Sequence, residues 1–210
     1  MRGVPGNWYP YRDRVSKTGS LAMKRSLGAK TLIYPTPAWL VGSYDEQGRP
    51  NVMTVAWGGI CCSQPPCVAV SLRKATYTYG NLMKRRAFTV SVPSQAHVKE
   101  TDYFGLTSGR DTDKFAAAGY TPVRSDLVDA PYVQEFPLIL ECSVVEVFEL
   151  GLHTQFVGQI LDVKADEEVL DAAGIPDILK VLPIIFSPGN WAYYGVGESL
   201  GHAFAVGKEI

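Results

Sequence analysis

The chain has 210 residues, of which 46% are hydrophobic and 20% charged, and these values exclude a wholly disordered protein. Its formal net charge of −1 argues against a nucleic-acid-binding protein. The length fits one domain, or one domain with short appendages, and allows a large core without disulfides. The 20 glycines and 14 prolines favour many turns and short strands over long helices.

The charge is unevenly distributed, because the first 30 residues carry seven Lys or Arg side chains and a single acid, Asp13. An Arg-rich, acid-poor start is typical of some targeting segments, but this one has no apolar stretch and so is not a secretory signal. We favour a basic leader over residues 1–22, flexible or derived from cloning, with Met23 as the natural start. One domain is then expected over residues 23–210.

Two uncharged stretches, residues 50–72 and 181–197, raise the question of membrane spans. Prolines and glycines interrupt both stretches, and a helix would break at the prolines. Two buried strands joined by a turn explain residues 50–72 better. The sequence therefore predicts no membrane-spanning segment.

The four cysteines, at positions 61, 62, 67 and 142, form no CxxC pair, and the three histidines do not lie at zinc spacing from them. Cys61 and Cys62 are neighbours in a predicted strand, so we expect their side chains to point to opposite faces. No metal site is predicted, and the thiols are expected to be buried and reduced in a cytoplasmic protein.

The predicted elements are mostly strands. In chain order, strands are expected over residues 31–44, 51–62, 66–72 and 87–92, followed by two long strands over 136–150 and 153–165. Helices are expected over residues 78–86, 96–104 and 112–118, with a helical turn over 166–173. Thr76 or Thr78 would cap the first helix; Asp111 or Thr112 would cap the third, which would end at Gly119. Strands joined mainly by turns predict a small antiparallel barrel with helical insertions.

Two cations and three hydroxyls come just before the expected helix 78–86: Ser71, Arg73, Lys74, Thr76 and Thr78. The N-terminus of a helix has free N–H groups that favour an anion, and Arg can bind a phosphate through two parallel bonds. The same residues would also form an ordinary solvated corner with a helix cap. Both interpretations stay open on the residues alone.

The neighbouring strand carries Thr54, Val55 and Ala56, followed by Trp57. Small side chains let a planar ring approach the backbone, whose N–H and C=O groups can then bind the edge of that ring. Trp57 could flank such a ring, although a single Trp in a strand more often belongs to the core.

These segments together resemble the flavin reductase-like, FMN-binding split-barrel family, most closely its flavoredoxin subgroup. The resemblance rests on N-x-M-T-x-A-W from Asn51, P-P-C-V-A-V-S-L-R-K-A-T-Y-T from Pro65, and A-F-T-V from Ala87. It continues through residues 151–171 and ends with Y-Y-G-V-G from Tyr193 and L-G-H-A-F-A-V-G-K from Leu200. It covers about residues 24–208.

The resemblance implies a six-stranded antiparallel Greek-key split barrel, usually a homodimer, that holds FMN without a covalent bond. Residues Thr54, Val55, Ala56 and Trp57 would run along the isoalloxazine ring. The ribityl phosphate would be held by Ser71, Leu72, Arg73, Lys74, Thr76 and Thr78, with further contacts from Lys114 and Phe115. His153 would lie near the nicotinamide of an electron donor and act in the reaction.

We therefore expect an oxidoreductase that transfers electrons from NAD(P)H or a donor protein onto FMN and passes them on. The flavin supplies the chemistry in such proteins, which fits the absence of a catalytic triad. The chain has no GxGxxG, so a dinucleotide would bind shallowly or not at all. The alternatives are a non-enzymatic FMN electron carrier and the flavin-reductase component of a two-component monooxygenase.

Overall fold

The computed structural model describes residues 23–210, of which Ile33–Ile210 form one compact unit. Residues 23–32 are exposed. The basic leader predicted over residues 1–22 lies outside the described residues. Its boundary with the domain stays a prediction.

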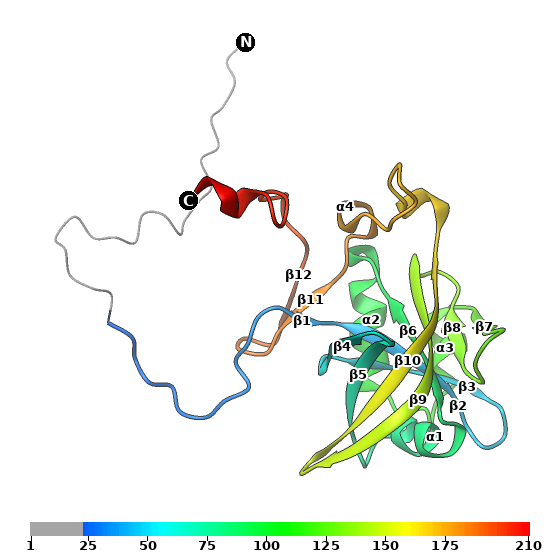
Figure 1. Cartoon of the computed structure of the whole chain (residues 1–210). Helices are drawn as coiled ribbons and strands as arrows, with labels where there is room; N and C mark the ends of the chain where they lie inside the picture. The colour runs from blue at the N-terminus through cyan, green and yellow to red at the C-terminus, as the bar shows by residue number, and fades with distance from the viewer. Residues whose placement is uncertain (1–22) are drawn as a thin grey trace. The chain divides into compact units, whose positions relative to one another are not determined.

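The described strands and helices follow one another as shown in Figure 1. The strands are β1 (Thr36–Pro37), β2 (Trp39–Tyr44), β3 (Pro50–Val55), β4 (Gly58–Ser63), β5 (Pro66–Arg73), β6 (Ala87–Val92), β7 (Pro122–Arg124), β8 (Pro131–Val133), β9 (Leu138–Leu150), β10 (His153–Ala165), β11 (Ile185–Ser187) and β12 (Ala192–Tyr194). The helices are α1 (Tyr77–Arg85), η2 (Gln95–His97), α2 (Val98–Leu106), α3 (Lys114–Ala118), η3 (Glu167–Val169), α4 (Ile178–Val181) and η4 (Val206–Glu209).

The main sheet contains seven antiparallel strands in the order β3-β2-β6-β9-β10-β5-β4. β3 and β4 stand at opposite ends of this order, yet only Ala56 and Trp57 separate them in the chain. The three Cα–Cα steps from Val55 to Gly58 reach at most about 11 Å, so the two ends of the sheet must meet. The sheet therefore curls into a barrel, and the predicted mainly β, antiparallel split-barrel fold is confirmed.

The single strand expected over residues 51–62 is wrong, because the chain divides it between the two ends of the sheet. β3 pairs with β2, whereas β4 pairs with β5. This division gives the main sheet seven strands in the described residues, where the resemblance implied six. The Ser71 N–H donates to the Trp57 carbonyl at 2.8 Å and fastens the connection to β5.

Both faces of the sheet are covered by apolar packing, and neighbouring residues of one strand serve different faces. Val41 packs in the barrel interior with Phe88 and Phe156, all of them fully buried. Leu40, the residue before it, packs on the outside with Phe104 of α2 and Phe115 of α3. The helices therefore cover one face of the barrel wall, and they bring the residues after α2 close to the start of α1.

The helices differ from the expected ranges mainly at their ends. α1 begins one residue earlier than expected, and Thr76 caps it by accepting from the Tyr79 N–H at 3.3 Å. α3 is capped by Asp113 in place of the expected Asp111 or Thr112, and it ends at Gly119, whose φ is 71°. The helical turn expected over residues 166–173 is only η3. The strand expected over residues 31–44 is divided into β1 and β2, and β7, β8, β11 and β12 were not predicted.

Two of the four cysteines depart from the expected burial. Cys67 and Cys142 are buried, but Cys61 and Cys62 are exposed on the edge strand β4. The pairing register shifts between Ile60 and Cys62, so Cys61 is the extra residue of a bulge and the strict alternation fails there. Among residues 23–210, no group of three metal-binding side chains is placed to hold an ion, and no helix is long and apolar enough to cross a membrane.

Candidate functional site

A cavity of about 240 Å³ lies beside the first turn of α1. Its walls come from four places: β3, the start of α1, the end of α2 with the loop after it, and the first residue of α3. Asn51 and Met53 line it from β3, Thr76 and Thr78 from α1 and its cap. Residues 105–110 and Lys114 complete the walls. The cavity therefore combines a helix N-terminus with a buried cation.

Lys114 is the most unusual group in this cavity, because its side chain is only 3% exposed. Its ammonium donates to the Val52 carbonyl and to the Phe104 carbonyl, both at 2.8 Å. Among residues 23–210, it forms no ion pair with an Asp or Glu side chain. Burial lowers the pKa of Lys114 to about 8. An ammonium has three protons, so one remains to donate into the cavity.

The hydroxyl groups of the predicted corner have different tasks. The Thr76 hydroxyl is occupied as the helix cap, since it also donates to the Arg73 carbonyl at 2.9 Å. The Thr78 hydroxyl is buried and accepts from Asn51 Nδ2 at 2.9 Å, which leaves its proton available to a ligand. Thr78 is therefore the better donor of the two.

Asn51 is a site residue that the sequence reasoning missed. Its side chain is 3% exposed, and its Oδ1 has no hydrogen-bond partner among the described residues. A Cβ at Gly109 would lie 2.0 Å from that oxygen, so the loop after α2 approaches it as closely as only glycine allows. A polar residue inside an uncharged strand was the available signal. Its significance depends on contacts with residues far along the chain.

Arg73, Lys74 and His153 do not line this cavity but lie together at the end of the β5–β10 pair. His153 is the direct partner of Arg73 in the register of these strands. Arg73 is exposed, and Lys74 forms an ion pair with Glu149 of β9. Ser71 belongs to the same edge, opposite Gln155. The predicted phosphate cluster over residues 71–78 is thus divided: Thr76 and Thr78 line the cavity, while the others lie at the exposed end of β5.

The remaining candidates lie on β3, on β5, in the connection after β3, and on α3. Val55 and Leu72 have side chains packed inside the barrel, so only their N–H and C=O groups could reach a ligand. Thr54 donates its hydroxyl to the Thr101 carbonyl of α2. Ala56 and Trp57 are half-buried at the connection between the two sheet ends. Phe115 packs among the aromatic residues outside the barrel, 2% exposed, which restricts it to a supporting position.

Comparison with known proteins identifies the family of the chain. The family model described as "Flavin reductase like domain" matches residues 31–191. The chain belongs to this family. The flavin reductase-like resemblance is thereby confirmed over most of the length of the chain.

Solved structures agree with this assignment. The chain is 57% identical to the flavoredoxin of Desulfovibrio vulgaris (Miyazaki F), with a TM-score of 0.85, over 88% of this chain and 100% of that one. It is 34% identical to the flavoredoxin from Methanosarcina acetivorans, with a TM-score of 0.84, over 90% and 99%. A third match is the FMN-binding protein from Thermus thermophilus, 26% identical with a TM-score of 0.73, over 87% and 98%. Membership of the flavin reductase-like family indicates a flavin-linked redox function for this chain.

Proposed function

We propose that this flavin reductase-like protein is an FMN-dependent oxidoreductase of the cytoplasm. It takes electrons from NAD(P)H or from a donor protein onto FMN held without a covalent bond, and it passes them to an acceptor. The isoalloxazine ring supplies the redox chemistry when FMN is bound, while the protein binds and orients it. The observation that carries the proposal is the buried ammonium of Lys114 beside the first turn of α1.

The cavity fits the phosphate end of FMN. A buried charge without a counter-ion is costly, and a phosphate would supply both the opposite charge and hydrogen-bond acceptors. Lys114 and Thr78 each have a proton to donate, and the first N–H groups of α1 have no helical acceptor. Asn51 Oδ1 needs a donor, and a ribityl hydroxyl is a group of that kind.

The cavity is smaller than a typical site for a whole cofactor, so only one end of the molecule would enter it. β3 leads away from Asn51, and Thr54 and Val55 follow at roughly 10 to 13 Å along the strand, at about 3.3 Å per residue, with Ala56 and Trp57 just beyond its end. This separation suits a ligand with a phosphate at one end and a flat ring at the other. We therefore keep the segment Thr54–Trp57 as the proposed contact of the ring.

The edge that carries Arg73 and His153 is the proposed entry side for the electron donor. His153 is half-buried at the start of β10, where its imidazole can hydrogen-bond a nicotinamide carboxamide or a pyrophosphate. Arg73, its neighbour across the strands, is an exposed cation suited to the phosphates of a dinucleotide. Orienting the donor is the proposed role of His153, because hydride transfer itself requires no protein base.

Absorbance of the purified protein under anaerobic conditions tests the proposal. We expect a yellow protein with one FMN per chain that bleaches on addition of NADH or NADPH. Bleaching only with an electron-donor protein would identify a carrier, a role favoured by the similarity to two flavoredoxins. Protein that neither retains nor binds added FMN would refute the proposed function.

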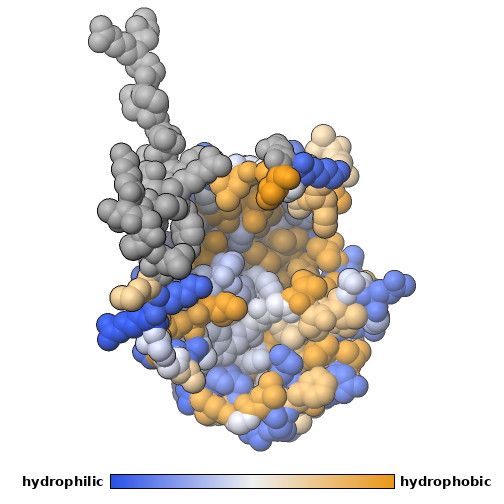
Figure 2. All heavy atoms as spheres, turned by 60° about the vertical axis from the view of Figure 1, so that its left-hand side comes forward, coloured by the Kyte–Doolittle hydropathy of each residue, from blue (hydrophilic) through white to orange (hydrophobic). Residues whose placement is uncertain are grey.

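We further propose that the protein is a homodimer. The β9–β10 hairpin exposes large apolar side chains. Figure 2 shows that apolar residues are frequent on the face it displays. The exposed large apolar residues of the hairpin are Val145, Phe148, Leu150, Leu152, Leu161 and Val163. Exposed apolar surface of this kind marks an interaction site. Light scattering should give twice the chain mass, and Phe148→Asp should shift it to the monomer; a monomeric parent would refute the dimer.

A further inference from the structure

The turn between β2 and β3 is tied to the cavity by a buried carboxylate, Asp45, which is 2% exposed. Its Oδ1 accepts from the N–H of Gln47 at 2.9 Å and from the N–H of Arg49 at 2.8 Å, as a tight turn requires. Its Oδ2 has a different use, since it accepts from Arg49 Nε and from the Tyr77 hydroxyl, both at 2.7 Å. The second oxygen therefore does more than close the turn.

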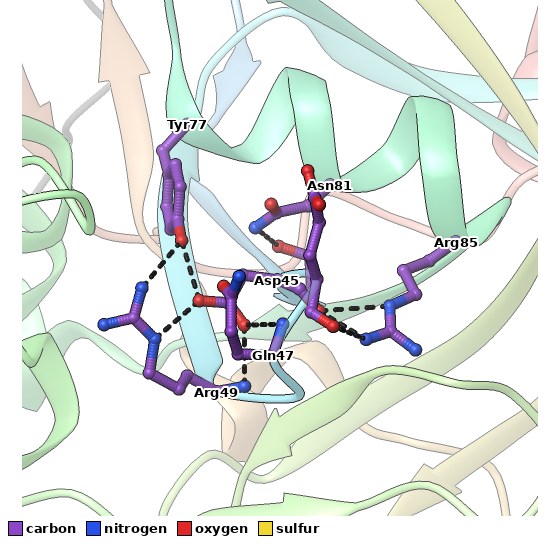
Figure 3. Close-up of polar contacts among 8 residues, drawn as sticks. Asp45, Gln47, Arg49, Tyr77, Asn81 and Arg85 are labelled. Atoms are coloured by element: carbon purple, nitrogen blue, oxygen red, sulfur yellow. Dashed lines mark hydrogen bonds and ion pairs between the residues drawn. The ribbon is translucent and has the colours of Figure 1, made fainter.

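Tyr77 is the point at which this network meets the cavity. It is the first residue of α1, and its ring lines the cavity wall. Arg49 Nη2 also donates to its hydroxyl, at 3.2 Å. Figure 3 shows the Tyr77 hydroxyl and the Arg49 guanidinium meeting at the Asp45 carboxylate. The ring is thus held at its far end by a carboxylate and a guanidinium.

The loop after α2 rests on the held ring. The Arg110 guanidinium lies over the Tyr77 ring, 5.6 Å from its centroid, and donates from Nη1 to the Ala75 carbonyl at 2.9 Å. A Cβ at Gly109 would come within 3.0 Å of Tyr77 Cδ1, so backbone and ring are in close contact. Arg110 lines the cavity and forms no ion pair within residues 23–210.

The turn itself is fixed from the other end of α1. Arg85 donates from Nε to the Asp45 carbonyl at 3.1 Å and from Nη1 to Asp129 at 2.8 Å (Figure 3 shows the contact with the turn). Asp45 is therefore bound to both ends of α1, through its carboxylate at Tyr77 and through its backbone carbonyl at Arg85. A group held in this way can position Tyr77 with little freedom.

We propose that Asp45 is a positioning residue that acts through Tyr77 to place Arg110 at the cavity, so that the cavity selects a phosphorylated flavin over riboflavin. This inference rests on the proposed FMN function. It assigns to Arg110 a contact with the phosphate, and to Asp45 and Tyr77 the task of holding that cation in place. None of the three was a candidate from the sequence.

The test compares FMN with riboflavin, which lacks the phosphate, by titration of flavin-free protein followed by flavin fluorescence. Tyr77→Phe removes the hydroxyl held by Asp45 and keeps the ring under Arg110. We expect it to weaken FMN binding about fivefold while riboflavin binding stays the same. Arg110→Met should lower the ratio of FMN affinity to riboflavin affinity by about tenfold or more, since it removes the charge itself. Tyr79→Phe is the matched control, because that ring packs against Phe156 inside the barrel.

A double-mutant cycle decides whether Asp45 acts through Tyr77. Asp45→Asn alone should lower the ratio of FMN affinity to riboflavin affinity. In protein that already carries Tyr77→Phe, the same substitution should lower this ratio almost no further. Equal weakening of FMN and riboflavin, an unchanged preference in Tyr77→Phe, or a full effect of Asp45→Asn in that background would each overturn the inference. A parent protein with no preference for FMN would instead refute the proposed phosphate site.

Discussion

Two groups of positive charge on this chain differ in how they are held. Lys114 is 3% exposed and is bound only by backbone carbonyls within the described residues. Lys74, at the end of β5, has a side chain that is 55% exposed and pairs with Glu149, itself 54% exposed. Exposed pairs of this kind contribute little and are screened by salt, whereas a buried ammonium strongly favours a bound anion.

The comparison separates residues that the sequence reasoning placed in one phosphate-binding cluster. In our proposal, the cavity holds one anionic group tightly in a fixed geometry. The strand edge with Arg73 and His153 can attract a charged molecule that arrives and leaves. A tightly held cofactor phosphate and a transient electron donor require these two kinds of site. Substitutions on each side should therefore affect different measurements.

The largest expected effect is that of Lys114→Met. Loss of the charged hydrogen bond to the phosphate should cost about 2 to 3 kcal/mol, or on the order of a hundredfold in FMN affinity. Fluorescence titration measures this loss, and circular dichroism checks that the barrel folds. Lys84→Met is the control, because Lys84 is an exposed lysine paired with Glu46. Unchanged FMN affinity in the Lys114 variant would remove the cavity from the phosphate site.

The pH dependence of FMN affinity tests the role of the buried Lys114. The pKa of Lys114 is lowered by burial to about 8, and a bound phosphate would favour the charged form. FMN affinity should therefore fall as the pH rises above 8, by about tenfold at pH 9. FMN keeps its phosphate dianion in this range, so the lysine is the group that titrates. Lys114→Met should bind weakly with no such pH dependence, and a dependence that persisted would point to another group.

The stability of the flavin-free protein should change in the opposite direction. The pKa of Lys114 is below its unfolded value, so between about pH 8 and pH 10.4 the unfolded chain binds more protons. The free energy of unfolding should then rise with pH across that window, and it should be insensitive to this group below pH 8. Urea titrations at several pH values measure the trend. The parent and Lys114→Met should differ in slope only inside the window.

His153→Ala tests the exposed edge. FMN affinity should stay the same, while the rate of reduction by NAD(P)H should fall roughly tenfold, as expected for the loss of one orienting hydrogen bond. Stopped-flow bleaching measures the rate. His202→Ala, in the exposed C-terminal segment, is the matched control. Loss of bound flavin from the His153 variant would make this residue a cofactor ligand. The strand end would then belong to the flavin site, and the contrast with the cavity would be wrong.

The smallest effect is expected for Arg73→Ala. Because Arg73 is exposed, its removal should slow reduction by NAD(P)H only about threefold at low salt. The difference from the parent should vanish at high salt. A tenfold or greater loss of FMN affinity would return Arg73 to the flavin phosphate, as the family resemblance implied.

Much of the fold could be predicted from local pattern. β9 and β10 alternate apolar and polar residues around Gly151, and the structure has both strands within two residues of the expected ends. The division between β3 and β4 could not be predicted in this way, because residues 51–62 are uniformly uncharged and the break depends on which strands each half joins. The hydrophobic pattern within a segment does not show which strands that segment pairs with.

The candidate site shows the same division between local and distant information. The residues before α1 predicted either Thr76 or Thr78 as its cap, and the structure selects Thr76. Lys114 came from family resemblance, and Asn51 was marked only as a polar residue inside an uncharged strand, whereas Tyr77 and Arg110 had no signal of their own. Their importance arises from contacts across β3, α1 and the loop after α2, which are separated by long stretches of sequence. Only the fold brings these residues to one cavity.

The closure of the barrel also determines the order in which this protein can fold. The hairpins β2–β3, β4–β5 and β9–β10 each join neighbouring segments and can form early. The pairing of β5 with β10 joins residues 66–73 to residues 153–159, and it must wait until the intervening chain is organised. Such non-local pairing predicts refolding in milliseconds to seconds, with the pairing of β5 and β10 among the last contacts to form.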